Sequence, residues 1–290
     1  MNPDDVQPEW ARKFYASRMQ SFTEVFRTER PIVGMVHLHP LPGAPAYNGE
    51  PMDEIIDSAV KDAKALVENG VDGIIVENMW DLPYFVGKKV PPEEMVAHGV
   101  AAREVIRAAG VPAGITVIHN GGRVTLGIAK AAGAKFMRVD LLTGSYLWDT
   151  GDLDHGVGAE LLRLRKELHA GDIKFFADVY KKHAVMFPGI DPETHAVWTD
   201  FYMADALIVT GRMTGAETPL ELVKRVKGAA PERKILIGSG FSVDNAEKLM
   251  TVADGAIVGT SLKYKGMTVN PVDPERVRRL MAVVRKVRGE

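Results

Sequence analysis

The stretch ADGAIVGTSLK, residues 253–263, places a short apolar run directly before glycine, threonine, serine and lysine. The run at 255–258 is typical of a buried strand, whereas Gly259, Thr260 and Ser261 are too small to contribute much packing. Small residues at the end of a strand allow a ligand to approach the main chain closely. The stretch therefore predicts a buried strand that ends at a binding site.

Seven similar runs precede this one, and segments with helical periodicity separate them. In the segment 52–70, for example, the apolar residues form one stripe and Gly70 ends the helix. Eight strand–helix units favour an α/β fold of the closed (β/α)8 or TIM-barrel type, because closure removes both sheet edges. The expected strands are 31–38, 73–78, 113–120, 135–140, 174–180, 206–211, 234–240 and 255–259.

Length and composition agree with one globular barrel domain over residues 1–290, since the chain is 46% hydrophobic and 26% charged. A net charge of −2 without a basic tract argues against a nucleic-acid partner. No apolar stretch approaches the roughly 20 residues of a membrane span, and the acidic start is unlike a secretory signal. The absence of cysteine excludes disulfides and thiolate metal sites. We expect a cytoplasmic protein.

Residues 1–30 form an N-terminal extension that we expect to be helical. Trp10, Phe14, Phe22 and Phe26 recur at multiples of four, with Val25 beside them. Such an apolar stripe has to be covered, either by the barrel floor or by a partner subunit. We favour the floor, and we also expect a homo-oligomer.

The glycine-rich ends of the last two strands predict a phosphate site. Loops after the seventh and eighth strands of this fold frequently bind phosphate, and free backbone N–H groups at such turns suit an anion. The other interpretation is that these glycines only make tight turns. We also expect the loop after the sixth strand to touch the ligand. The predicted ligand-binding residues in these loops are Thr210, Gly211, Thr214, Gly238, Ser239, Gly240, Gly259, Thr260 and Ser261.

The other strand ends carry polar groups that a purely structural strand would avoid, because burying an unpaired ion is costly. We expect Asp178 to transfer a proton, Lys182 and Arg138 to stabilise an oxyanion, and His37 or Glu77 to make a second transfer. Alternatively, Lys182 forms a Schiff base or a plain salt bridge, and Arg138 and Asp140 are structural ions. The candidate catalytic residues are His37, Glu77, Arg138, Asp140, Asp178 and Lys182, and further candidate ligand contacts are Asn78, His119 and Asn120.

No cofactor is predicted. A metal held by His37, Glu77, His119 and Asp178 is chemically possible, but their spacing matches no known metal motif. The long connection at 141–156, which contains Tyr146 and Trp148, is expected to be either a lid over the mouth or a subunit contact.

Several stretches also resemble a known family: GMVHLHPLPGAP, GVDGIIVENMWDLPY, AAGAKFMRVDLLTGSYLWDTG, FADVYKKHA and GSGFSVDNAEKLMTVADGAIVGTSLK. Together they resemble the BtpA family, which also contains SgcQ, over nearly all of residues 31–263. The resemblance implies a TIM barrel of the ribulose-phosphate-binding type. One branch of the family is linked to photosystem I biogenesis and another lies among sugar-metabolism proteins.

The resemblance also implies which residues belong to the site. The residues that match the family are His37, Glu77, Asn78, Asn120, Arg138, Asp178, Lys182, His183 and the two glycine-rich strand ends. The sequence departs from the family pattern at His119-Asn120-Gly121, at Asp140 and at Tyr180. These departures fall in the expected pocket.

Two functions follow from these patterns. The first is an enzyme that binds a phosphorylated sugar or nucleoside-like metabolite and performs acid–base chemistry, such as isomerisation, lysis or glycosidic-bond cleavage. The second is a noncatalytic assembly or stability factor, as the resemblance to the BtpA family implies. Exposed apolar patches would favour the second, and a shielded pocket lined with ions would favour the first.

Overall fold

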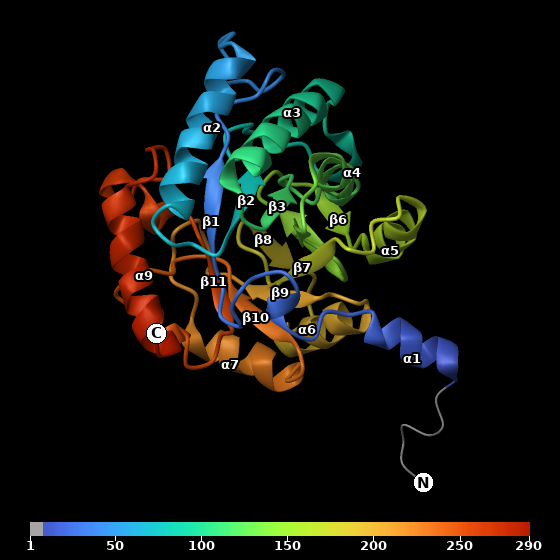
Figure 1. The fold of residues 1–290 in the computed structure, drawn as a ribbon. Coiled ribbons are helices and arrows are strands. Elements are labelled where there is room, and N and C mark those ends of the chain that lie inside the picture. Colours follow the sequence, from blue (N-terminus) through green and yellow to red (C-terminus); the bar gives the residue numbers. More distant parts are fainter. Residues whose placement is uncertain (1–7) are drawn as a thin grey trace.

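A computed structural model describes residues 8–290, in which eight parallel strands close into a barrel in the order β1-β11-β10-β9-β7-β4-β3-β2 (Figure 1). All eight expected strands are present, and the predicted TIM barrel is confirmed. The strands are β1 (Ile32–His37), β2 (Gly73–Glu77), β3 (Ala113–Thr116), β4 (Phe136–Val139), β7 (Lys174–Val179), β9 (Ala206–Val209), β10 (Lys234–Ile237) and β11 (Gly255–Val258).

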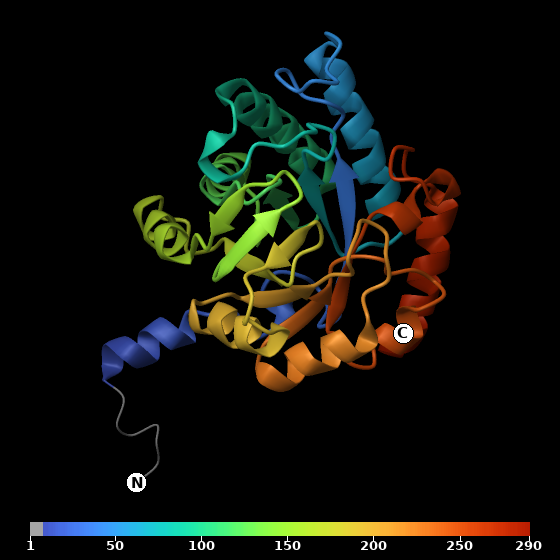
Figure 2. The same ribbon diagram turned by 180° about the vertical axis from the view of Figure 1, so that it is seen from behind.

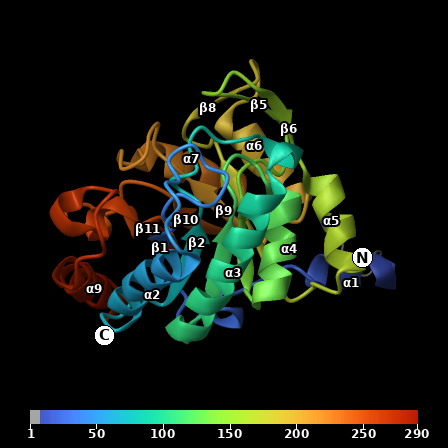
Figure 3. The same ribbon diagram turned by 90° about the horizontal axis from the view of Figure 1, so that it is seen from above.

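Helices surround the barrel (Figure 3); all but the last of them connect successive barrel strands, and α9 follows the final strand β11. Their inward faces and the outer faces of the strands form the main apolar core. The helices are α2 (Met52–Val67), α3 (Pro92–Ala109), α4 (Gly122–Ala132), α5 (Gly158–Glu167), α6 (Pro192–Phe201), α7 (Leu220–Ala229), α8 (Ala246–Leu249) and α9 (Pro274–Arg288). Within residues 8–290, no helix is both long enough and apolar enough to cross a membrane.

The N-terminal extension closes the barrel floor with only part of its length. Phe22 and Phe26 are buried, and their rings pack against Phe176 and Phe136 with centroids 5.9 and 5.4 Å apart. The floor contact of these two residues is as expected. Phe22 belongs to the 3-10 turn η2 (Phe22–Glu24), which begins with a capping box formed by Ser21 and Glu24.

The expectation of one continuous helix on the floor is wrong. Helix α1 (Glu9–Ala16) ends before η2 and projects away from the barrel (Figures 1 and 2). Trp10 is therefore 72% exposed and Phe14 is 46% exposed. The spacing of four residues continues past the end of α1 into η2, so it groups residues that lie on different surfaces.

A small antiparallel sheet lies beyond the carboxyl ends of the barrel strands (Figure 3). Its strands are β5 (Ser145–Trp148), β6 (Leu153–His155) and β8 (Ala184–Met186), in the order β6-β5-β8. The long connection at 141–156 thus forms a hairpin that pairs with the segment after β7. Tyr146 and Trp148 are buried beneath this sheet.

Candidate functional site

A pocket of about 510 Å³ opens at the carboxyl ends of the barrel strands. This volume suits a small metabolite. Eleven of the candidate residues line the pocket: His37, Glu77, Arg138, Lys182, Thr214, Gly238, Ser239, Gly240, Gly259, Thr260 and Ser261. Both glycine-rich strand ends therefore face the same cavity as the candidate ions.

The pocket wall contains backbone N–H groups without a protein acceptor. In residues 8–290, the amides of Ser239, Gly240, Gly259 and Thr260 donate to no protein group, whereas the amide of Gly238 donates to the carbonyl of Val209 at 2.8 Å. Unpaired amides next to a cavity offer hydrogen bonds to a ligand. The two loops thus supply four available donors to one pocket.

Close packing fixes the loop after β10, which contains Ser239 and Gly240. Gly240 has a φ of +64°, and a Cβ at this position would lie 2.2 Å from the carbonyl oxygen of Ala216. Only glycine fits such a site without rearrangement. The hydroxyl of Ser239 accepts from the amide of Gly211 at 2.7 Å, and the side-chain amide of Asn245 donates to the carbonyl of Gly240 at 2.8 Å.

His37 and Glu77 lie side by side because β1 and β2 pair in register at these two residues. The distance between His37 Nε2 and Glu77 Oε1 is 3.6 Å. Burial, with the charges of Lys263 and Lys182, holds the pKa of His37 well below its ordinary value. His37 is therefore a neutral imidazole, and its buried Nδ1 has no hydrogen-bond partner in the described part of the chain.

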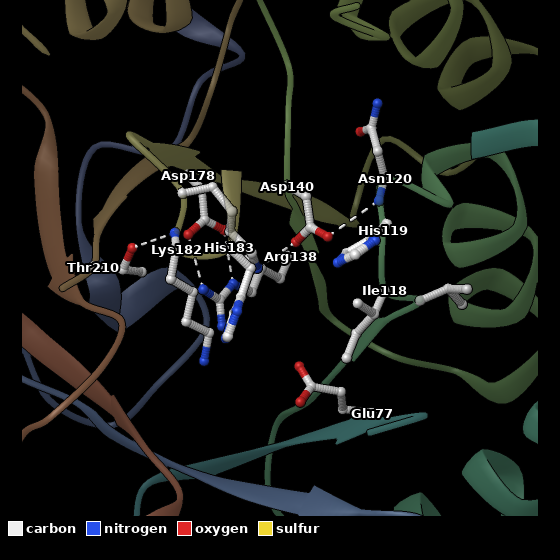
Figure 4. Close-up of polar contacts among 12 residues, drawn as sticks. Glu77, Ile118, His119, Asn120, Arg138, Asp140, Asp178, Lys182, His183 and Thr210 are labelled. Carbon is white, nitrogen blue, oxygen red and sulfur yellow. Dashed lines mark hydrogen bonds and ion pairs between the residues drawn. The ribbon is translucent and has the colours of Figure 1, made fainter. Parts of the chain in front are cut away.

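Arg138 and Asp178 form a buried ion pair between β4 and β7 (Figure 4). The guanidinium donates to the carboxylate from Nε at 2.7 Å and from Nη2 at 2.8 Å. Burial alone would lower the pKa of Arg138, but the charge and hydrogen bonds of Asp178 outweigh it and raise this pKa. Asp178 does not line the pocket; it holds Arg138, which does.

Lys181 is a functional candidate that the sequence did not reveal. Its Nζ lies 2.7 Å from Asp140 Oδ1 and 3.7 Å from Asp178 Oδ2, and the residue is buried. Strict alternation along the strand would place Lys182, and not Lys181, on the same face as Asp178. Tyr180 has a φ of +58°, which breaks the alternation after β7 and allows both lysines to point inward.

Lys182 extends into the pocket without a protein partner for its Nζ in the part of the chain that the structure describes. Its backbone N–H donates to the hydroxyl of Thr210 at 2.8 Å, which fixes the start of this loop (Figure 4). Burial, followed by the positive charges of Arg138 and Lys181, lowers the pKa of Lys182 to about 8. The salt bridge to Asp178 that the sequence allowed is not formed.

Seven candidate residues lie outside the pocket, and most of them support its walls or the small sheet. The hydroxyl of Thr210 accepts from the backbone N–H of Lys182, in the loop after β7. The backbone N–H of Gly211 donates to the hydroxyl of Ser239, in the loop after β10. His119 stacks on Trp148 with ring centroids 4.5 Å apart, and Asn120 donates to Asp154 on β6 at 2.7 Å. The complete set is Asn78, His119, Asn120, Asp140, Asp178, Thr210 and Gly211.

The four residues considered as metal ligands do not come together. His119 lies under Trp148, Asp178 faces Arg138, and only His37 and Glu77 are neighbours. Among residues 8–290 there is no group of three or more histidine, aspartate or glutamate side chains placed to hold a metal ion.

Sequence reasoning also missed part of the pocket wall. Asn245 was not singled out, although its side chain braces the loop at Gly240 and accepts from the amide of Ser242 at 2.9 Å. The Ser-x-x-Asn spacing after the glycine-rich strand end was the available signal. The further wall residues are Met35, Met79, Gly215, Glu217, Phe241, Ser242, Asp244, Lys248, Ile257, Val258 and Gly266.

Comparison with known proteins identifies the family of this barrel. The sequence pattern that defines the BtpA family matches residues 28–286. The chain belongs to the BtpA family. Photosystem I biogenesis protein BtpA of Synechocystis sp. is 38% identical over 257 residues, covering 88% of each chain. The putative sgc region protein SgcQ of Escherichia coli is 34% identical over 272 residues, covering 93% of this chain and all of its own.

An archaeal relative and two barrels of known structure extend the comparison. An uncharacterised protein of Pyrococcus furiosus is 40% identical over 265 residues, covering 90% of this chain and 97% of its own. The structures of a mutant tryptophan synthase α-subunit and of N-(5'-phosphoribosyl)anthranilate isomerase from the same organism match with TM-scores of 0.56 and 0.54. Their identities are 18% and 13%, and they cover 90% and 89% of this chain and 98% and 99% of their own. At these identities the match shows that this BtpA-family chain shares their fold.

Proposed function

We propose that this BtpA-family barrel is an enzyme that binds a small phosphorylated metabolite and performs acid–base chemistry on it. The observation that carries the proposal is the set of four unpaired amides at Ser239, Gly240, Gly259 and Thr260, which face one pocket with Lys182. Preorganised N–H groups bind an anion without the cost of rearranging the loop. An unpaired lysine adds positive charge to the same cavity.

Proton transfer is assigned to the pair of His37 and Glu77. Glu77 is a carboxylate that can accept a proton, and the neutral imidazole of His37 can donate a hydrogen bond to an oxygen that gains charge. Asp178 was the expected base, but both of its oxygens face Arg138. We therefore assign Asp178 to positioning Arg138, and Arg138 to stabilising an oxyanion.

Calorimetric titration with dihydroxyacetone phosphate and with inorganic phosphate tests the binding site. We expect both anions to bind, with competition between them, and we expect the variant Gly259→Val to weaken both. The Cβ of that variant would lie 3.2 Å from His37 Cε1, so the added methyl groups would enter the pocket. No binding of either anion to the wild-type protein would contradict the proposal.

The second candidate function is a noncatalytic assembly factor, which one surface feature favours. Leu147 pairs with Leu153 on one side and with Val185 on the other, and these three side chains are 49%, 68% and 67% exposed. The small sheet thus presents a continuous apolar row. A relative of this chain carries the name photosystem I biogenesis protein, which motivates the comparison.

Surface and pocket variants separate the two candidates. An assembly factor that works through this row would lose its protein partner, or its self-association, in Leu147→Asp, and would keep it in Lys182→Met. Sedimentation velocity and affinity capture measure both effects. An enzyme of the proposed kind would keep phosphate binding in Leu147→Asp and weaken it in Lys182→Met, as calorimetry measures, because Lys182 lines the pocket and Leu147 does not.

A further inference from the structure

Lys181, Lys182 and Lys263 lie near the carboxyl end of the barrel, and Lys182 differs from the other two. Lys181 pairs with Asp140 at 2.7 Å, and Lys263 pairs with Asp62 at 2.5 Å. Lys182 forms no ion pair or hydrogen bond through its Nζ within residues 8–290. An unpaired ammonium group in a partly buried site is costly, so such a group is a candidate for chemistry.

We propose that Lys182 is the nucleophile of the pocket and forms an imine with the carbonyl carbon of a phosphorylated aldehyde or ketone. This inference rests on the proposed phosphate site and adds the chemical class of the substrate. The amides of the two loops would hold the phosphate, and Lys182 would meet the carbonyl group at the other end of the ligand. Both features line the same cavity of about 510 Å³.

The surroundings of Lys182 favour the neutral amine that imine formation requires. Burial and the charges of Arg138 and Lys181 lower its pKa to about 8. A lysine activated in this way, by a dry site and neighbouring cations, is an effective nucleophile near neutral pH. Asp178 and Asp140 pair with those two cations and keep them in place.

The reaction balances without a further reactant. The Nζ lone pair adds to the carbonyl carbon, the carbon–oxygen π electrons move to oxygen, and this oxygen is protonated. The carbinolamine then loses its hydroxyl group as water after a second protonation, while the nitrogen releases one proton. The net change joins an amine, a carbonyl group and one proton into an iminium ion and water. Glu77, which lines the pocket beside His37, would exchange these protons, and the neutral imidazole of His37 would donate a hydrogen bond to the oxygen.

Reductive trapping tests the inference on the full chain. The protein is incubated with glycolaldehyde phosphate or dihydroxyacetone phosphate and sodium cyanoborohydride, and peptide mass spectrometry locates the adduct. We expect one major adduct at Lys182 with the mass of the probe less one oxygen atom. We expect unphosphorylated glycolaldehyde to label Lys182 at least tenfold more slowly. The labelling rate should rise as the pH increases through about 8, because the amine loses its proton there.

The variant Lys182→Arg keeps the positive charge but cannot form an imine. We expect it to give no adduct in the pocket, and circular dichroism verifies that the variant is folded. Labelling of Lys248 at the pocket rim with Lys182 unmodified would overturn the inference. So would the absence of an adduct at Lys182 with both phosphorylated probes.

Calorimetry with inorganic phosphate distinguishes failure of this inference from failure of the proposed function. If phosphate binds and no adduct forms at Lys182, the phosphate site stands and the nucleophile is wrong. If phosphate does not bind, both the proposed function and the inference fail.

Discussion

The carboxylate of Asp178 accepts two hydrogen bonds from the guanidinium of Arg138, at 2.7 and 2.8 Å. This two-point contact joins β7 to β4 inside the barrel, where both side chains are almost completely buried. Such bidentate pairs are geometrically specific. Arg138 is consequently held at the pocket wall by a residue that does not itself reach the pocket.

We expect Asp178→Asn to destabilise the protein by about 3–5 kcal/mol, because it leaves a buried guanidinium without its countercharge. Urea unfolding, followed by circular dichroism, measures this loss. The matched control is Glu193→Gln, which removes the carboxylate of an exposed bidentate pair with Arg225. That pair is on the surface, so we expect little change in stability. A stable Asp178→Asn variant that has lost only activity would instead support the role of Asp178 as a base.

We expect Gly240→Ala to abolish binding of inorganic phosphate. Its φ of +64° and the 2.2 Å approach of the Ala216 carbonyl to the added Cβ would displace the loop that carries two of the free amides. Calorimetry measures the binding, and circular dichroism verifies that the barrel is intact. Gly228→Ala is the control, because this exposed glycine lies within α7 and a Cβ there meets nothing within 4 Å. The control should bind normally and gain about 0.5–1 kcal/mol of stability.

Stability should depend on pH through Lys182. Between about pH 8 and about pH 10.4, the unfolded chain keeps a proton on this lysine that the folded chain has released, so folding stability rises with pH in this window. Below about pH 8, Lys182 is protonated in both the folded and the unfolded state, so the folded state carries the full free-energy cost of the buried ammonium group. We therefore expect Lys182→Met to be more stable than the wild type by about 1–3 kcal/mol at pH 7, with the difference shrinking toward pH 10. Guanidinium unfolding at both pH values measures it. A difference that does not change with pH would contradict the lowered pKa.

The floor of the barrel should depend on Phe22 and not on Trp10. Phe22 is fully buried against Phe26 and Phe176, so Phe22→Ala should cost about 3–5 kcal/mol through the cavity that it leaves. Trp10 is 72% exposed on α1, and Trp10→Ala should leave the stability nearly unchanged. Thermal unfolding of the two variants compares them. Equal losses would mean that α1 packs against the barrel in solution.

The eight barrel strands were predictable because each is a local apolar run, and burial on both faces makes the signal continuous along the sequence. The position of the pocket was predictable because parallel strands bring their carboxyl ends to one end of the barrel. His37 and Glu77 followed from this geometry, and so did the glycine-rich ends at Gly240 and Gly259.

The features that could not be predicted depend on contacts between distant segments or on single dihedral angles. Strand β8 pairs with β5 across nearly forty residues, and neither segment has a strong strand pattern of its own. The inward position of Lys181 depends on the positive φ of Tyr180, which period-two alternation does not anticipate. The pairing of Asp178 with Arg138 was one of several possible ion pairs, and the register between β4 and β7 selects it.

A crystal structure of the protein with dihydroxyacetone phosphate tests the central claim most directly. The expected result is a phosphate group whose oxygens lie about 2.7–3.2 Å from the backbone nitrogens of Gly240 and Thr260, with the carbonyl carbon directed toward Lys182 Nζ. A phosphate bound elsewhere, or a pocket in which these amides face no ligand at a saturating concentration, would contradict the claim.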